Sequence, residues 1–480
     1  MLFNSSAYIL FLALVFFLYW LLAGLPRIAV LLLLAANYFF YGQWSPKYLV
    51  LIFLSSTVDY LVGRAMGTAT TAGRRKLLLV AVTGYHLTVL CTFKYFNFFM
   101  QSYTEITGWL GQPSAGHFLD VIVPVGISFF TFQSISYAVD VYRRKIEPCR
   151  DYLEYLTYVS FFPQMIAGPI VRATTFFPQF RNRTPLTNEQ GARAFFLIMA
   201  GLVKKVAIAD FLAINIVDRV FEFPERFSAL EVLAAVYAYA IQIYCDFSGY
   251  TDIAIGSALL LGITLPINFD APYTASSLPD FWRRWHISLS TWLRDYVYLP
   301  LELGSLRRNG APRPSSAYQN LIITMLLGGL WHGAAWTFVI WGALHGLGLA
   351  FTRFIERLSW WRRVQQLKCW WLEAICLFLT FHFVCLGWIF FRAANFDRAF
   401  AILKQLGTLT CEHANLGTAI LVVLAIGFVT HWLPERLVDR ARIAFSTLPA
   451  PAQATLILAI GIALYKVSSS NVVPFIYFQF

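Results

Sequence analysis

The chain has 480 residues, of which 58% are hydrophobic and only 13% are charged, and its mean hydropathy is +0.61. This composition excludes an ordinary soluble domain, in which about a quarter of the residues are charged. The formal net charge of +12 lies in clusters that flank apolar segments, which indicates membrane topology, lipid headgroups or a polyanionic nucleotide-bearing ligand rather than nucleic acid. We therefore expect an all-α polytopic membrane protein, with residues 1–480 as one integral-membrane domain.

Apolar segments recur from the first residues to the last, and several are long enough to cross a bilayer. The predicted spans are 8–25, 28–41, 48–62, 77–99, 121–141, 194–220, 230–245, 321–351, 371–391, 419–431 and 455–465. We expect the first to be a retained span, because the sequence shows neither a basic region before it nor a small-residue cleavage site after it.

Basic clusters orient the chain, because Lys and Arg are retained on the cytoplasmic side of a membrane. GRRK at residues 73–76 follows the third predicted span, and RRKIEPCR at residues 143–150 follows the fifth. Both clusters place the N-terminus outside, and residues 101–120, which contain no Lys or Arg, fit an outside loop. RLVDRAR at residues 436–442 returns inside, so we expect the C-terminus outside as well.

Two hydrophobic segments have basic residues at both flanks, which predicts that each enters the membrane and returns. The segment 155–172, YLTYVSFFPQMIAGPIVR, is interrupted by proline, and its broken backbone requires cover by protein. The segment 320–352 is longer than the roughly 20 residues of one crossing, and glycines at positions 328, 329 and 333 offer places to break or to pack closely.

Two histidines lie in this second segment, within a run from Pro314 to Thr352 that has no charged residue. In a helix the rise from Leu321 to His332 is about 16 Å, which places His332 near the middle of the bilayer. An ionisable group there costs several kcal/mol unless it has partners or a hydrated cavity, so His332 is a candidate functional residue. The alternative is an imidazole that bonds a neighbouring helix. His345, thirteen residues further along the chain, fits that alternative better.

A third histidine, His286, lies in FWRRWHISLSTWLRDYVYLP, where aromatic residues alternate with arginines. This composition is typical of the membrane interface, with rings at headgroup depth and guanidinium groups facing phosphate. One interpretation is an amphipathic helix on the cytoplasmic face. The other is that its basic face borders the entrance to a cavity into which His286 points.

Two polar clusters favour contacts between helices over catalysis. One contains Asp246, Ser248, Thr251 and Asp252, and the other contains Ser128, Thr131, Gln133 and Ser134. Intramembrane carboxylates are costly unless they are paired, so the first cluster is expected to cap a helix or to bond across helices. The second is expected to hold neighbouring helices together.

The sequence contains no HExxH, P-loop, Rossmann or GxSxG motif. Its cysteines lack CxxC pairs and metal-ligand spacing, and no spacing supports a metal held by the three histidines. We therefore predict no metal site.

Taken together, five motifs resemble the membrane-bound O-acyltransferase family, and within it the bacterial alginate O-acetyltransferase branch. They occur in the family's order over residues 123–346, which we take as the family-matching core: VPVGISFFTFQSISYAVDVYR, FFPQMIAGPIVR, DFSGYTDIAIG, FWRRWHISLSTWLRDYVYLPL and GGLWHGAAWTFVIWGALHG. The resemblance implies a many-helix bundle with re-entrant segments and a central funnel. It also implies that His332 is the catalytic histidine and that His286 is the second histidine of the active site.

The resemblance further implies a bacterial inner-membrane enzyme that O-acetylates an exopolysaccharide such as alginate. The expected donor is acetyl-CoA from the cytoplasm, with its phosphates against Arg283, Arg284 or Arg294. Periplasmic partner proteins are expected to accept the acetyl group before the polymer does. A neutral imidazole suits removal of a hydroxyl proton during attack on a thioester, which makes His332 the proposed general base.

Three alternatives remain open. D-Alanyl transfer to teichoic acid from a carrier-protein thioester would use the same two histidine motifs. A transporter of polysaccharide or lipid-linked sugar would also place ionisable groups in the membrane. In a non-catalytic scaffold of a secretion complex, the histidines would be structural.

Overall fold

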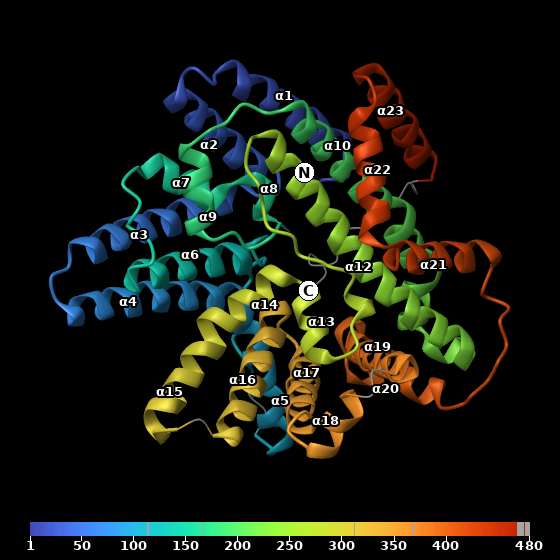
Figure 1. Ribbon diagram of the computed structural model, residues 1–480. Helices are drawn as coiled ribbons and strands as arrows, with labels where there is room; N and C mark the ends of the chain where they lie inside the picture. The colour runs from blue at the N-terminus through green and yellow to red at the C-terminus, as the bar shows by residue number, and fades with distance from the viewer. Residues whose placement is uncertain (113–114, 167, 312, 367–368, 468–474, 476–480) are drawn as a thin grey trace. The chain divides into compact units, whose positions relative to one another are not determined.

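The computed structural model describes residues 1–112, 115–166, 168–311, 313–366, 369–467 and 475, without the side chains of residues 362 and 365. Within these residues the secondary structure is helical and contains no β-strand (Figure 1), which confirms the all-α class. The chain forms two compact units, residues 1–194 with 254–266 and residues 195–253 with 267–480. That these units act as one membrane domain stays a prediction.

In the first unit, several helices begin with a side chain that caps their first backbone N–H groups. The Ser5 side chain accepts a hydrogen bond from the Tyr8 backbone N–H at the start of the first helix, and Asp151 accepts from Leu153 and Glu154 at the start of α7. Such caps satisfy amide groups that a helix start leaves without partners. The helices are α1 (Ser6–Leu21), α2 (Pro26–Gly42), α3 (Leu49–Thr68), α4 (Ala72–Leu90), α5 (Phe96–Trp109), α6 (Ile127–Tyr142), α7 (Tyr152–Ser160), α8 (Phe162–Met165), α9 (Ala173–Arg181) and the start of α10 (Asn188–Leu202), with short helical segments at Pro46–Tyr48 and Cys91–Tyr95.

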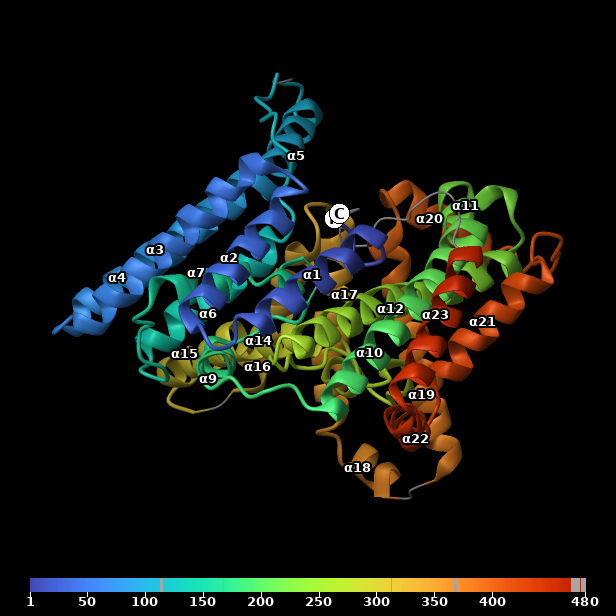
Figure 2. The same cartoon turned by 90° about the horizontal axis from the view of Figure 1, so that it is seen from above.

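Contacts between buried polar groups hold these helices together. Gln133 on α6 donates a hydrogen bond to the backbone carbonyl of Tyr158 on α7 at 2.9 Å, which confirms the predicted role of this residue between helices. His86 Nε2 on α4 lies 2.6 Å from Asp59 Oδ1 on α3, and both side chains are fully buried. α3 and α4 run side by side in Figures 1 and 2.

The proline-interrupted segment does not form a continuous helix. α7 ends at Ser160, the short α8 covers Phe162–Met165, and α9 starts at Ala173. Residues 155–166 and 168–171 are buried, so protein covers the broken backbone as the sequence predicts.

The second unit begins within α10 and contains the longest helix of the described chain, α12 (Ala229–Leu260), whose last residues belong to the first unit. The predicted span 230–245 is too short, because α12 continues for 32 residues. The other helices are α11 (Asp218–Glu222), α13 (Leu278–Arg284), α14 (Ile287–Leu293), α15 (Leu299–Asn309), α16 (Pro314–His332), α17 (Trp336–Ile355), α18 (Ser359–Gln366), α19 (Trp370–Arg392), α20 (Phe396–Leu406), α21 (Thr418–His431), α22 (Glu435–Thr447) and α23 (Ala450–Val467). Short segments lie at Val203–Asp210, Ala213–Val217, Pro224–Arg226, Pro272–Thr274 and Arg294–Tyr298.

Ion pairs explain why α12 continues through two aspartates. Asp246 lies 2.7 Å from the ammonium of Lys205, and Asp252 lies 2.7 Å from that of Lys204. Both lysines belong to the segment Val203–Asp210, so each carboxylate pairs with a cation from another helical segment. This confirms the prediction of bonding across helices, because pairing offsets the cost of burying the charges.

Six helical segments of the described chain are long and apolar enough to cross a membrane, or seven if the bent pair α21 and α22 counts as one span. The six are Pro46–Thr68, Ala72–Trp109, Ala229–Leu260, Trp336–Ile355, Trp370–Arg392 and Ala450–Val467. α1 and α2 are apolar but shorter. The chain is therefore a multi-pass membrane protein.

Candidate active site

The segment that carries His332 is a helix hairpin. α16 ends at His332, residues 333–335 break the helix, and α17 starts at Trp336. This confirms that the segment turns back on itself. It also corrects the relation between His332 and His345, which do not lie on one helix because the chain reverses between them.

Glycines allow the two arms of the hairpin to pack closely. A Cβ atom on Gly329 would lie 2.3 Å from the carbonyl oxygen of Phe338, and one on Gly342 would lie 2.4 Å from that of Met325. At the break, a Cβ atom on Gly333 would lie 2.1 Å from the ring of Phe338. Because Cβ atoms never approach other atoms so closely, these glycines fix the position of His332 at the tip of the hairpin.

His332 lies at this tip in an aromatic environment, with only 3% of its surface exposed. The centroid of its ring lies 4.9 Å from that of Trp331, 4.9 Å from that of Trp341 and 5.1 Å from that of Phe391. The rings of Trp341 and Phe391 meet its face at steep angles. Edge-to-face packing of this kind restricts the orientation of the imidazole.

His286 lies at a sharp break between α13 and α14. Its backbone has φ 41° and ψ 56°, a left-handed conformation that is uncommon for residues other than glycine. The prediction of one amphipathic helix here is therefore wrong: two short helices meet at His286. The side chain is fully buried, and burial lowers the pKa of His286 to about 3. The imidazole is thus neutral at physiological pH.

Asn268 holds this break in place. Its backbone carbonyl accepts a hydrogen bond from the Ile287 N–H at 2.9 Å, and its side-chain oxygen accepts one from the Ser288 N–H at 3.1 Å. These two amides directly follow His286, so Asn268 stabilises the strained turn. Asn268 is not among the site residues predicted from the sequence. The available signal was an amide side chain in PINFD, residues 266–270.

The structure brings the two predicted histidines to the same aromatic side chain. The ring of Trp331 lies 4.9 Å from that of His332 and 5.8 Å from that of His286. Phe247, on α12, also contacts the site, with its ring centroid 4.6 Å from that of His286. Three separate segments of the second unit therefore converge on one buried site that contains two imidazoles.

His345 has a different environment, in which its ring accepts a hydrogen bond. Trp282 Nε1, on α13, donates to His345 Nδ1 at 3.3 Å. Trp341 lies between the two histidines of the hairpin, 4.8 Å from His345 and 4.9 Å from His332. The bond to Trp282 agrees with the structural role expected for His345.

The three predicted phosphate-binding arginines differ in position. Arg283 is exposed and pairs with Asp280, and Arg284 pairs with Asp280 and Asp270. Arg294 pairs with its neighbour Asp295 and lines a pocket of about 370 Å³. Of these three arginines, Arg294 is the one that lines this pocket.

This pocket lies between α13, α14, α16 and α17. Trp282, Leu293, Arg294, Met325 and Arg353 are among its lining residues. The helix rise from Met325 to His332 is about 10 Å, so the pocket borders the arm that carries the catalytic candidate. Among the described residues there is no group of three or more His, Cys, Asp or Glu side chains that could hold a metal ion.

Comparisons with known proteins identify the family of the chain. The sequence pattern of the membrane-bound O-acyltransferase family matches residues 143–387, a region that contains both site histidines. The chain is 37% identical to a probable alginate O-acetylase of Azotobacter vinelandii over the full length of both proteins. It is 36% identical to a peptidoglycan O-acetyltransferase of Helicobacter pylori, with 84% of this chain and 79% of that protein covered. A teichoic acid D-alanyltransferase of Streptococcus thermophilus is 31% identical over 56% of this chain and 68% of that protein.

The chain therefore belongs to the membrane-bound O-acyltransferase family. It is a multi-pass membrane enzyme that transfers acyl groups, and its relatives over most of its length are O-acetyltransferases by name.

The role of Asn268 can be tested by substitution. We expect Asn268→Ala to lower the turnover number about ten- to a hundredfold, because a small displacement of a catalytic group has an effect of this size. The Ser288 N–H would lose its acceptor, which costs about 1–3 kcal/mol. Steady-state kinetics and thermal unfolding of the purified protein measure the two effects.

Two further variants control this experiment. Asn268→Asp retains an oxygen that accepts the Ser288 N–H, so it should keep more activity than Asn268→Ala. Asn182→Ala, at an exposed position, should leave both measurements unchanged. Equal activity of Asn268→Ala and the wild type would exclude a positioning role.

Proposed function

We propose that this enzyme moves an acetyl group from cytoplasmic acetyl-CoA across the inner membrane, for O-acetylation of an exopolysaccharide such as alginate. The observation that carries the proposal is the pair of buried imidazoles, His332 at the tip of the hairpin and His286 at the strained turn, which both contact the ring of Trp331. The names of the relatives over most of the chain, alginate O-acetylase and peptidoglycan O-acetyltransferase, support acetyl as the group transferred.

In the proposed reaction, His332 acts as the general base. It takes the proton of the acceptor hydroxyl while that oxygen attacks the carbonyl carbon of the acetyl thioester. The carbon–sulfur bond breaks, the thiolate of CoA leaves, and the protonated His332 returns its proton to the thiolate, which restores the neutral imidazole. His286, neutral because burial lowers its pKa to about 3, donates a hydrogen bond to the thioester oxygen, where negative charge develops. Because both imidazoles are buried, binding of the substrates must open the site.

The donor is proposed to enter through the pocket that Arg294 lines. Arg353 lines the same pocket and donates a hydrogen bond to the Tyr298 hydroxyl at 2.7 Å. Two guanidinium groups at a mainly apolar pocket suit a ligand with an apolar arm and charged phosphates. The thioester arm of acetyl-CoA would then extend along α16 toward His332.

The acceptor is proposed to lie on the periplasmic side, where partner proteins receive the acetyl group and pass it to the polymer. The basic clusters of the sequence support this orientation, with both termini outside. D-Alanyl transfer from a carrier protein is the second candidate. The match to a teichoic acid D-alanyltransferase supports it, and this match covers a shorter part of the chain. Genes that flank this one, for a carrier protein or for polysaccharide acetylation, distinguish the two.

We expect Arg294→Gln to raise the KM for acetyl-CoA about tenfold and to leave kcat nearly unchanged. The reason is that a lost phosphate contact of about 1.4 kcal/mol weakens the binding of the substrate and of the transition state alike. The measurement is acetyl-CoA-dependent release of free thiol by the protein reconstituted in lipid vesicles, with the acceptor present.

Arg283→Gln is the matched control, because Arg283 is exposed and does not line the pocket. Its KM should stay at the wild-type value. An increase in KM for Arg283→Gln without one for Arg294→Gln would place the phosphates elsewhere. Thiol release from a D-alanyl carrier protein but not from acetyl-CoA would support the second candidate instead.

A further inference from the structure

A second cavity lies in the second unit and shares no lining residue with the pocket beside the histidines. Its volume is about 640 Å³, and α10, α12, α21, α22 and α23, with the segment Val203–Asp210, contribute to its wall. The lining residues of α21 to α23 lie beyond residues 143–387, the region that matches the family. The cavity is therefore not built from the family region alone.

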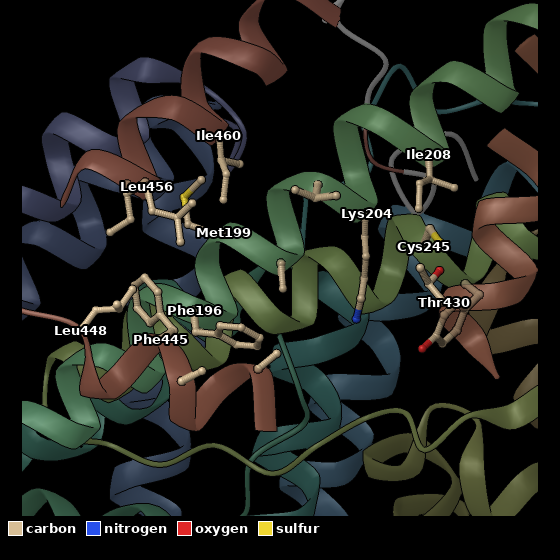
Figure 3. A pocket seen from close by; sticks show the side chains of 16 residues that line it. Phe196, Met199, Lys204, Ile208, Cys245, Thr430, Phe445, Leu448, Leu456 and Ile460 are labelled. Atoms are coloured by element: carbon tan, nitrogen blue, oxygen red, sulfur yellow. The ribbon is translucent and has the colours of Figure 1, made fainter. Parts of the chain in front are cut away.

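The two ends of this cavity differ in chemistry (Figure 3). At one end, Phe196, Phe445, Leu448 and Leu456 gather into an apolar group. The side chain of Lys204 stands apart from this group, at the end where Cys245 and Thr430 lie. The cavity thus offers a long apolar surface that ends at a cation.

Lys204 is paired but retains access to the cavity. Its ammonium lies 2.7 Å from Asp252, yet 30% of its side chain is exposed although apolar helices surround it. The exposure arises because the side chain lines the cavity. An anionic group that enters at this end meets a positive charge already held in position by a carboxylate.

α22 indicates where the cavity lies relative to a bilayer. The axes of α21 and α22 form an angle of 92°. If α21 crosses the membrane, α22 therefore runs along the membrane surface. Ala441, Ala444, Phe445 and Leu448 recur at three- and four-residue spacing and face the cavity. Arginines at 440 and 442 flank this stripe on the helix surface. With α21 across the membrane, the cavity lies at the depth where acyl chains meet headgroups.

We propose that this cavity binds one acyl chain of an anionic membrane phospholipid, whose phosphate is attracted by the cations nearest the cavity in the sequence and the structure, Lys204 in its wall and the arginines that flank the α22 stripe. The acyl chain would lie against the apolar group of Phe196, Phe445, Leu448 and Leu456. The bound lipid would fill the space between α10, α12 and the three C-terminal helices and would hold α22 at the membrane surface.

The volume and the charges favour a lipid over a helix of a partner protein. A volume of 640 Å³ falls within the range of about 300–1,000 Å³ that is typical of small-ligand sites. It corresponds to little more than one turn of a helix about 10 Å in diameter. Lys204, although it is paired with Asp252, favours an anionic group at this end of the cavity, and clusters of arginine at the membrane surface attract anionic headgroups.

Native mass spectrometry of the purified protein, titrated with phosphatidylglycerol or phosphatidylcholine, tests the proposal. We expect the wild type to retain one phosphatidylglycerol at least about tenfold more tightly than phosphatidylcholine. Ala444→Trp fills the apolar end and should weaken phosphatidylglycerol binding about tenfold. Arg440→Ala should retain a lipid but lose the preference between the two headgroups.

Ala454→Trp is the matched control, because Ala454 is exposed on α23 and does not line the cavity. Leu456→Trp, which blocks the cavity from another helix, replaces Ala444→Trp if that variant does not fold. Equal binding of phosphatidylglycerol by the control and by the folded blocked variant overturns the proposal. So does a wild type that carries only detergent, or one whose cavity is cross-linked to a protein helix instead of a lipid.

Discussion

The His332→Ala enzyme should lose acetyl transfer about 10²- to 10⁴-fold, the range associated with loss of a general base. The hydroxyl proton would have no acceptor at the tip of the hairpin, whereas the aromatic rings around the site would remain. The measurement is alkali-labile acetate on the secreted polysaccharide of cells that carry only the variant gene. Secretion of the polymer itself should continue.

Three controls distinguish loss of catalysis from loss of folding and from loss of secretion. His413→Ala changes an exposed histidine and should leave acetylation intact. Thermal unfolding in detergent should show that the His332→Ala protein folds, because a scaffold with a structural histidine would be destabilised. If secretion stopped and the residual polymer stayed acetylated, the transporter alternative would replace the enzyme.

Substitution of His286 should have the second largest effect. We expect His286→Gln to lower turnover about 10²-fold, because loss of one donor to the developing oxyanion has an effect of this order. Burial lowers the pKa of this group to about 3, so it is almost wholly neutral above about pH 5. Its removal should lower the pH–rate profile between pH 5 and 9 without changing the shape.

The profile separates two roles for His286. A donor that stays neutral contributes no limb to the profile in this range, so a parallel decrease supports hydrogen bonding to the thioester. Loss of an acidic limb in His286→Gln would instead identify it as the group that accepts the proton. Asn268→Ala serves as a reference, because it should disturb the same turn while the imidazole remains.

Several features of the fold follow directly from the sequence, because they depend on local physics. The apolar run around His332 exceeds one crossing and contains glycines at its centre, and the structure places the break at residues 333–335. The paired aspartates of α12 were predicted to bond across helices, because an unpaired charge in an apolar setting is too costly. Lys204 and Lys205 supply those partners.

Other features depend on contacts between residues distant in the sequence. Two hydrogen bonds to Asn268 hold the left-handed turn at His286. The composition around His286 is typical of a helix and does not indicate these bonds. Trp331 joins the two imidazoles only because the hairpin and the turn converge. The sequence does not distinguish the role of Arg283 from that of Arg294, yet of these two residues only Arg294 lines the pocket.

By itself, the sequence determined the class of the protein and its apolar segments, and it singled out the two histidines that we propose for the site. Hydropathy, basic flanks and short motifs are properties of neighbouring residues, so they can be read along the chain. The tertiary structure alone decided the geometry of the site, the choice among the arginines and the existence of the apolar cavity. Each of these arises from the packing of segments far apart in the chain, which no local pattern encodes.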